Sequence, residues 1–346
     1  MASSSQSTSE ESFLICTALR YDPLLLGSIE NSRPALNFVS PSPFYMLVYH
    51  RDRLLEAAQH FEFPAVVDVL QDGEALHKAI LKEVERHVEE TGKDVPLKVR
   101  VLFEKSGKMI VDLAPVAATS LQNLYPASLD PPGKRELTPH PAQRHAETKA
   151  FEPSALTGGA LELGPTDSLP SQASPAEWLL RLDKDATPSS PFTLLKTTVR
   201  DLYNTSRARA LPTNPQNPRF VEVILYNECN ELTEGTVTSL YFFRGGRWVT
   251  PPVGVPAGAF TATTLKEGDG EGWDEGELRK PFAGRWGHSV RSSKVGAGGQ
   301  RGTTRRWALI QGMCMEETVG VDTVQVGERV WVSNGVVGFG FGRVVD

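Results

Sequence analysis

The chain has 346 residues, of which 40% are hydrophobic and 23% are charged, and its formal net charge is −6. This length suffices for one large domain or two modest domains with buried cores. The acidic balance and the lack of a basic stripe argue against a nucleic acid partner. No apolar run reaches the ~18 residues of a membrane span.

The three cysteines, Cys16, Cys229 and Cys314, lie far apart in the sequence. Their separation fits no metal-ligand spacing, and it is typical of a protein in a reducing compartment. We therefore expect a cytoplasmic protein. Residues 1–12 are rich in Ser and Glu and predict a disordered tail that lacks the apolar core of a signal peptide.

Residues 13–118 predict a small α+β domain. Residues 13–21, FLICTALRY, predict a buried strand, and residues 44–49, FYMLVY, predict a second one. The second strand leads directly into a helix that begins near His50, where apolar residues recur at helical spacing. A long helix and two paired strands complete this domain: residues 73–91, 96–103 and 109–113.

Residues 119–176 are rich in Pro, Ser, Gly and His and have no periodicity, which predicts a flexible insertion or linker. His140 and His145 within it do not have metal-ligand spacing, so we predict no metal site. Residues 177–346 predict a larger second domain that contains a Gly-rich insertion at 265–298.

The second domain alternates predicted strands with two predicted helices. Glu234 falls in a predicted turn between two of the strands. The strands are expected at residues 177–182, 219–226, 237–243, 248–250, 317–322, 328–331 and 336–345. The helices are expected at residues 197–211 and 305–313.

Lys196 lies between an apolar run and the predicted helix 197–211. A lysine that forms a Schiff base must lose its proton near neutral pH, far below its reference pKa of about 10.4. Apolar surroundings and a nearby cation both lower a lysine pKa. If the helix opens at Thr197, Arg200 lies on the same face as Lys196. Taken alone, these features also fit a solvated surface lysine.

Three motifs occur in a characteristic order: LLKTTVRDLY at residues 194–203, NELTEGTVTSLYFFRGGRWVTPP at 230–252 and RGTTRRWAL at 301–309. Their order, type and spacing resemble the class IV aminotransferase family, the fold-type IV pyridoxal-phosphate enzymes. The segments GTTRRWALIQGMCMEE and WVSNGVVGFGFGRVV are most similar to fungal aminodeoxychorismate lyase-like proteins. The resemblance implies an α+β fold with a small N-terminal domain, a larger pseudo-barrel domain, a cofactor between them and a homodimer.

The resemblance also implies roles for individual residues. Lys196 would be the catalytic lysine that bonds pyridoxal 5'-phosphate, and Glu234 would face the pyridine nitrogen. Arg53, in the His-x-x-Arg-Leu pattern that starts at His50, matches the phosphate-binding arginine. Further cofactor-binding residues are Thr303, Thr304 and Gly335, with amides at a helix start. Candidate substrate-binding residues are Arg20, Arg200 and Asn334.

The sequence departs from the family pattern in three places. The insertion at residues 265–298 directly precedes the expected phosphate loop. Ser239 replaces an asparagine that many members have, and the N-terminal strand lacks the usual Gly-rich lead-in. The insertion and the missing lead-in keep a non-catalytic relative open as one interpretation.

Two enzymatic interpretations also stay open. The first is a lyase of folate biosynthesis, which converts 4-amino-4-deoxychorismate into 4-aminobenzoate and pyruvate with Lys196 as general base. The second is a class IV aminotransferase of the branched-chain or D-amino acid type. The Lys-x-x-x-Arg spacing of Lys196 and Arg200 resembles the lyase and some D-amino acid enzymes. The Gly-Gly-Asn-Tyr run typical of branched-chain transaminases is absent after the lysine.

Overall fold

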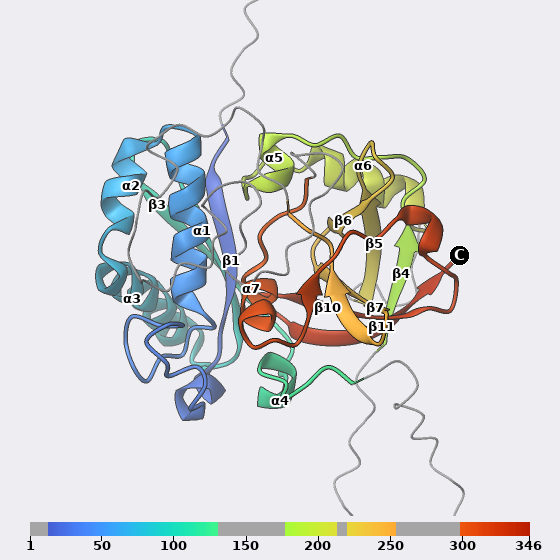
Figure 1. Cartoon of the computed structure of the whole chain (residues 1–346). Helices are drawn as coiled ribbons and strands as arrows, with labels where there is room; N and C mark the ends of the chain where they lie inside the picture. Colours follow the sequence, from blue (N-terminus) through green and yellow to red (C-terminus); the bar gives the residue numbers. More distant parts are fainter. Residues whose placement is uncertain (1–12, 131–176, 213–219, 254–297) are drawn as a thin grey trace, which may run out of the picture.

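The computed structural model describes residues 13–130, 177–212, 220–253 and 298–346, which form two lobes (Figure 1). The predicted N-terminal tail and nearly all of the predicted insertion at 265–298 lie outside the described residues. So does most of the predicted linker, from residue 131 to 176. The first part of that linker is described, and it contains the short helix α4 (Leu121–Leu124), whose Leu124 is fully buried.

The first lobe is an antiparallel three-stranded sheet in the order β1-β2-β3, covered by helices (Figure 1). Its core is formed by one face of β1 and β2 and by the apolar faces of the helices. Burying these faces is the main stabilising contribution in a lobe of this size. The strands are β1 (Ile15–Tyr21), β2 (Leu97–Phe103) and β3 (Met109–Pro115), and the helices are α1 (Leu47–His60), α2 (Pro64–Leu70) and α3 (Gly73–Thr91), with a 3₁₀ helix, η1 (Pro23–Gly27).

Two predictions for this lobe have opposite outcomes. The helix at 73–91 is confirmed, because the Asp72 side chain accepts a hydrogen bond from the Ala75 amide at 2.9 Å and Gly92 ends the helix in the left-handed region. The strand at 44–49 is wrong, since helix α1 already begins at Leu47 and Phe44 makes only a single bridge to Tyr21. A short apolar run does not distinguish a strand from a buried helix start.

The second lobe is an eight-stranded sheet in the order β6-β5-β4-β11-β10-β7-β8-β9. The sheet curls, and the amide of Leu232 in β6 donates to the carbonyl of Val319, just after β9, at 2.8 Å. The strands are β4 (Trp178–Leu182), β5 (Val221–Tyr226), β6 (Leu232–Gly235), β7 (Ser239–Arg244), β8 (Arg247–Thr250), β9 (Met315–Glu316), β10 (Arg329–Asn334) and β11 (Gly338–Val345). The helical elements are α5 (Pro191–Leu194), α6 (Asp201–Ala210), α7 (Thr303–Ile310) and the 3₁₀ helix η3 (Val321–Thr323).

The structure corrects several boundaries in this lobe. The predicted helix 197–211 begins only at Asp201, so residues 197–200 are not helical. The predicted strand 317–322 is wrong, because β9 ends at Glu316 and η3 follows. Glu234 lies inside β6 rather than in a turn. Helix α7 begins at Thr303, two residues before the predicted start.

The second edge of β1 joins the two lobes. The Cys16 amide donates to the Lys196 carbonyl at 3.1 Å, and the Thr198 amide donates to the Leu14 carbonyl at 2.9 Å. Further along the same strand, the Arg20 amide donates to the Gly335 carbonyl at 2.9 Å. The segment of Lys196 and the turn of Gly335 are therefore both fixed against β1, where the lobes meet.

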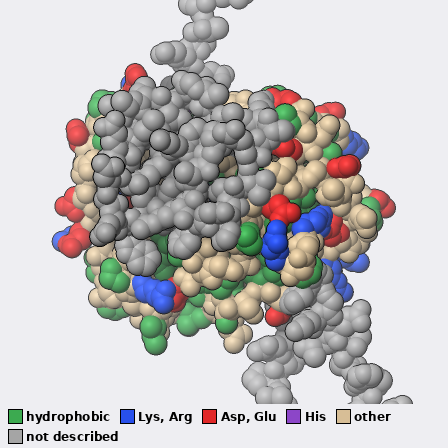
Figure 2. All heavy atoms as spheres, in the orientation of Figure 1, with side chains coloured by type: hydrophobic (Ala, Val, Ile, Leu, Met, Phe, Trp, Pro, Cys, Tyr) green, Lys and Arg blue, Asp and Glu red, His purple; other side chains and the backbone are tan. Residues whose placement is uncertain are grey.

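The surface of the described residues carries both signs of charge. Acidic and basic side chains are interspersed over the face that Figure 2 shows. None of the described helices is long and apolar enough to span a membrane. Within the described part of the chain, no group of three His, Cys, Asp or Glu side chains could hold a metal ion.

Candidate active site

A cavity of about 460 Å³ lies at the junction of the lobes. It receives side chains from β1, α1 and β2 of the first lobe, and from β6, β10 and the segments that begin at Lys196 and Gln300 in the second. Six of the predicted site residues line it together with Lys196: Arg53, Arg200, Glu234, Thr303, Asn334 and Gly335.

Lys196 projects its amino group into this cavity and donates a hydrogen bond to Gln300 Oε1 at 3.3 Å. Loss of solvent around the amine lowers the pKa of Lys196 to about 8, and the cations Arg53 and Arg200 act in the same direction. Cys16 and Glu234 oppose the shift. A substantial fraction of Lys196 is therefore neutral, and nucleophilic, near physiological pH.

Glu234 is buried in the cavity wall and is oriented by Tyr203, whose hydroxyl donates to Glu234 Oε1 at 2.7 Å. Burial raises the pKa of Glu234 to about 7, against the opposing effects of the Tyr203 hydrogen bond and the Gln300 backbone. Gln300 Nε2 also donates to the Tyr203 hydroxyl at 3.1 Å. One chain of hydrogen bonds thus runs from Lys196 through Gln300 and Tyr203 to Glu234.

Sequence reasoning missed both Tyr203 and Gln300. Tyr203 is three residues after Arg200, and the Arg200 guanidinium lies 4.8 Å above its ring. The three-residue spacing predicts this contact between Arg200 and Tyr203 only when helix α6 is known to begin at Asp201. Gln300 lies just before the motif that begins at Arg301 and belongs to no motif itself, so the sequence held no signal for it.

The other end of the cavity has the features of an anion site. Arg53 donates from Nη2 to Thr17 Oγ1 at 2.5 Å, and among the described residues its buried Nε has no hydrogen-bond partner. Helix α7 begins beside it at Thr303, and Gly302 supplies no side-chain cap for the first amides of the helix. An arginine fork and uncapped helix amides together suit a phosphate group.

Two glycines allow the backbone to approach closely at this end. A Cβ on Gly302 would lie 2.3 Å from Ser239 Oγ, and a Cβ on Gly335 would lie 2.6 Å from the ring of His50. Burial and the nearby cations lower the pKa of His50, so its imidazole is neutral there. Its Nδ1 lies 2.7 Å from Thr17 Oγ1 and orients the hydroxyl that Arg53 binds.

The structure brings some predicted residues to the cavity and leaves others outside. Arg200 donates to the Thr236 carbonyl at 2.9 Å and faces the cavity even though residues 197–200 are not helical. Asn334 also lines the cavity, and its side-chain amide donates to the Val237 carbonyl at 3.2 Å. Thr304 does not line the cavity: its hydroxyl pairs at 2.8 Å with Oγ of Ser333, which does line it, and the Thr304 backbone lies in the first turn of α7.

The structure does not bring Arg20 into the cavity. Its guanidinium is buried, binds Asp22 at 2.8 Å and two backbone carbonyls, and does not line the cavity. Lys98 and Arg100, on alternate positions of β2, line the cavity in its place. Their alternation with buried residues was the signal that the sequence reasoning did not use.

The described residues fit pyridoxal 5'-phosphate. Lys196 is an amine with a lowered pKa, Glu234 is a buried acid that can face a pyridine nitrogen, and Arg53 offers an unpartnered Nε at an uncapped helix start. These three groups are the amine, acid and anion receptor that the cofactor requires.

Comparisons with known proteins agree with this geometry. The family model for amino-transferase class IV matches residues 160–279, a segment that contains Lys196 and Glu234. A Schizosaccharomyces pombe protein named "Putative aminodeoxychorismate lyase" is 28% identical over 153 residues. That match spans 40% of this chain and 65% of the relative's length.

The fold also has a counterpart among solved structures. A crystal structure named for a putative amino-acid aminotransferase from Mesorhizobium loti superposes with a TM-score of 0.50 and 16% identity. The match covers 96% of this chain and 100% of the other, and at this identity it shows the shared fold alone. The family match, the shared fold and the geometry of the cavity thus make the chain similar to the class IV aminotransferases, a family that depends on pyridoxal 5'-phosphate.

Proposed function

We propose that this protein is a 4-amino-4-deoxychorismate lyase that releases 4-aminobenzoate and pyruvate. The observation that carries the proposal is the pair Lys196 and Glu234 in one cavity that Lys98, Arg100 and Arg200 also line. The substrate carries two carboxylates, which such cations would bind. The name of the S. pombe relative supports the same reaction.

Bound pyridoxal phosphate supplies an electron sink for the carbon that bears the substrate amino group. Lys196 Nζ, once free and neutral, takes the proton from that carbon. Its position beside Gln300 Oε1 holds the amine in reach of the cavity. Glu234 would hold a proton at the pyridine nitrogen of a bound cofactor, and Tyr203 keeps its carboxyl oriented. Cleavage of the bond between the ring carbon and the enolpyruvyl oxygen then releases enolpyruvate, which takes up a proton to give pyruvate, and leaves an aromatic ring.

The experiment that tests this function is release of fluorescent 4-aminobenzoate from 4-amino-4-deoxychorismate by protein reconstituted with pyridoxal phosphate. Turnover by the wild-type protein supports the lyase. Absence of 4-aminobenzoate from protein that binds the cofactor, together with keto acid formed from an amino donor, would favour the aminotransferase instead.

The lowered pKa of Lys196 predicts how fast the apo protein captures pyridoxal phosphate at each pH. Only the neutral amine attacks the cofactor aldehyde, so the rate should rise with pH and level off above about 8. A solvated lysine would give a rate that keeps rising toward its ordinary pKa of about 10.4. Stopped-flow absorbance of the bound cofactor measures this profile.

Replacing Arg53 by methionine should weaken cofactor binding by about 10- to 100-fold, because one charge-assisted contact to the phosphate is lost. Pyridoxal without a phosphate should bind both proteins equally weakly. Arg51, two residues earlier, lies outside the cavity lining, so Arg51→Met is the matched control. Equal phosphate discrimination in Arg53→Met and wild type would contradict the assignment.

We also propose the homodimer that the family resemblance implies, and a cytoplasmic location. Light scattering of the purified protein measures the first. Fluorescence microscopy of a tagged chain measures the second.

A further inference from the structure

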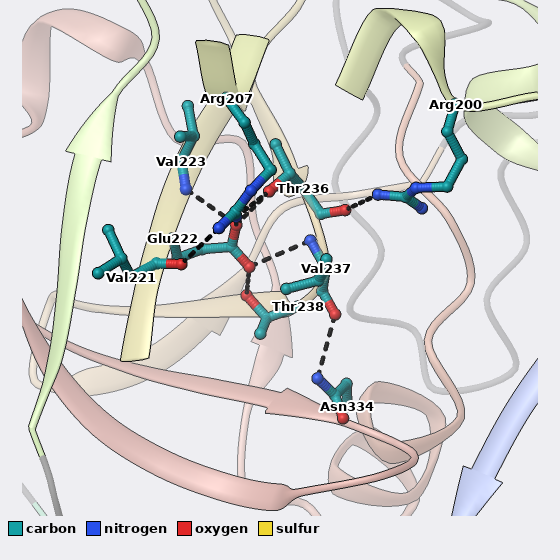
Figure 3. Close-up of polar contacts among 9 residues, drawn as sticks. All are labelled: Arg200, Arg207, Val221, Glu222, Val223, Thr236, Val237, Thr238 and Asn334. Carbon is teal, nitrogen blue, oxygen red and sulfur yellow. Dashed lines mark hydrogen bonds and ion pairs between the residues drawn. The ribbon is translucent and has the colours of Figure 1, made fainter. Parts of the chain in front are cut away.

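A fully buried carboxylate, Glu222 on β5, lies behind the cavity wall and takes no part in the chemistry described above. Five hydrogen-bond donors converge on its two oxygens (Figure 3). Oε1 accepts from Thr236 Oγ1 at 2.6 Å, from the Val223 amide at 2.8 Å and from Arg207 at 3.4 Å. Oε2 accepts from Thr238 Oγ1 at 2.7 Å and from the Val237 amide at 3.1 Å.

Three of these donors belong to consecutive residues of one turn, residues 236–238, and all three residues line the cavity. The same turn is held from other sides as well. Arg200 donates to the Thr236 carbonyl at 2.9 Å and Asn334 donates to the Val237 carbonyl at 3.2 Å (Figure 3). Glu222 therefore fixes the piece of backbone on which Arg200, a cavity cation, depends.

The turn also follows directly after Glu234. Gly235 lies between them, and a Cβ there would come within 2.7 Å of the Glu222 carboxyl carbon and 2.6 Å of Thr238 Oγ1. The Gly235 amide closes the turn by donating to the Thr238 carbonyl at 2.8 Å. The direction in which β6 presents Glu234 is thus set by the packing of Gly235 against Glu222.

We propose that Glu222 is a positioning residue for the cofactor site: its carboxylate holds turn 236–238 so that Glu234 and Arg200 are presented to the cofactor. Glu222 touches neither the cofactor nor the substrate and acts through that turn. The effect of Glu222 on catalysis rests on the proposed function. Its effect on the site is measured as binding of pyridoxal phosphate, whereas the proposed function is measured as release of 4-aminobenzoate, so each claim can fail without the other.

Only a group that accepts hydrogen bonds on both oxygens satisfies this arrangement. In Glu222→Gln, an amide nitrogen at the position of Oε1 would face the Val223 amide and Arg207. At the position of Oε2 it would face the Val237 amide. The first orientation opposes two N–H donors and the second opposes one, so each releases at least one buried backbone hydrogen bond.

The chain offers a matched control in Asp183. This carboxylate is also buried, and it is paired with Arg209, which lies two residues after Arg207 on helix α6, at 2.5 and 2.6 Å. Asp183 does not line the cavity, and its carboxylate binds Arg209 and the Lys184 amide rather than turn 236–238. Asp183→Asn thus disturbs a buried ion pair on the same helix without touching the site.

The experiment compares Glu222→Gln, Asp183→Asn and wild type by apo-protein thermal unfolding, by affinity for pyridoxal phosphate and by the pH profile of cofactor capture. The groups that face Lys196 and set this profile are Arg53, Arg200, Cys16 and Glu234. Both variants should lose thermal stability. Glu222→Gln alone should weaken cofactor binding about tenfold. It alone should also move the midpoint of capture upward, because a less well-held Arg200 depresses the pKa of Lys196 less.

Arg207→Met gives a second variant should Glu222→Gln fail to fold. Its guanidinium binds both Glu222 and Thr236 from a partly exposed position, so a smaller shift in the same direction is expected. Wild-type affinity and midpoint in both Glu222→Gln and Arg207→Met would overturn the proposal. An equal shift in Asp183→Asn would overturn it as well, since the effect would then be general destabilisation.

Discussion

Lys196→Ala should abolish both the visible absorbance of bound pyridoxal phosphate and the release of 4-aminobenzoate. In the proposed function, the amine both bonds the cofactor and takes the substrate proton. A general base alone contributes ~10²–10⁴-fold to a rate. Because both roles are lost together, we expect activity to fall by at least the upper end of this range.

The matched control is Lys184→Ala. Lys184 is an exposed lysine of the same lobe that does not line the cavity, so its loss should leave absorbance and turnover unchanged. Fluorescence of 4-aminobenzoate and the absorbance spectrum measure the two effects in one sample. Turnover that persists in Lys196→Ala would show that another group is the base.

Glu234→Gln should reduce turnover by about 100-fold while the cofactor still binds through Lys196 and Arg53. In the proposed function, the carboxyl holds a proton at the pyridine nitrogen, and a neutral amide cannot sustain that charge. Burial raises the pKa of Glu234 to about 7, so this group changes its protonation close to the working pH. We expect the absorbance band of the variant to lose part of its pH dependence near neutrality.

Glu228→Gln is the control for this variant, because Glu228 is exposed and lies six residues earlier in the same β5–β6 hairpin. Initial rates measured from pH 6 to pH 9 distinguish Glu234→Gln from Glu228→Gln, because this range extends roughly one pH unit below and two above the Glu234 pKa. A Glu234→Gln protein with wild-type rates over that range would contradict the role of Glu234.

The sequence motifs predicted that Lys196, Glu234 and Arg53 lie in one site. The three residues come from distant segments of the chain and line the same cavity. Each lies in a segment whose residue types are tied to the chemistry of the cofactor. The assignment of roles to them is what the variants above test.

The local geometry around these residues was harder to predict. The expected helix from Thr197 would have placed Arg200 by helical periodicity, but residues 196–198 pair with β1 instead. Arg200 reaches the cavity through its bond to the Thr236 carbonyl. Tertiary pairing overrides local helix propensity here.

The supporting residues depend on contacts that no single stretch of sequence contains. Gln300 bridges Lys196 and Tyr203 over more than 90 positions of the chain, and Glu222 binds a turn that begins 14 residues later. Arg20 shows the converse case. Its charge and position suggested a substrate ligand, and the fold uses it to bind Asp22 and two backbone carbonyls.

The most direct test of the proposed function is the product balance with 4-amino-4-deoxychorismate as the sole substrate and no keto acid added. We expect the reconstituted protein to form pyruvate and 4-aminobenzoate in equal amounts over many turnovers, since a lyase needs no amino acceptor. Absence of 4-aminobenzoate, or conversion that stops after one equivalent until a keto acid is supplied, would contradict the lyase.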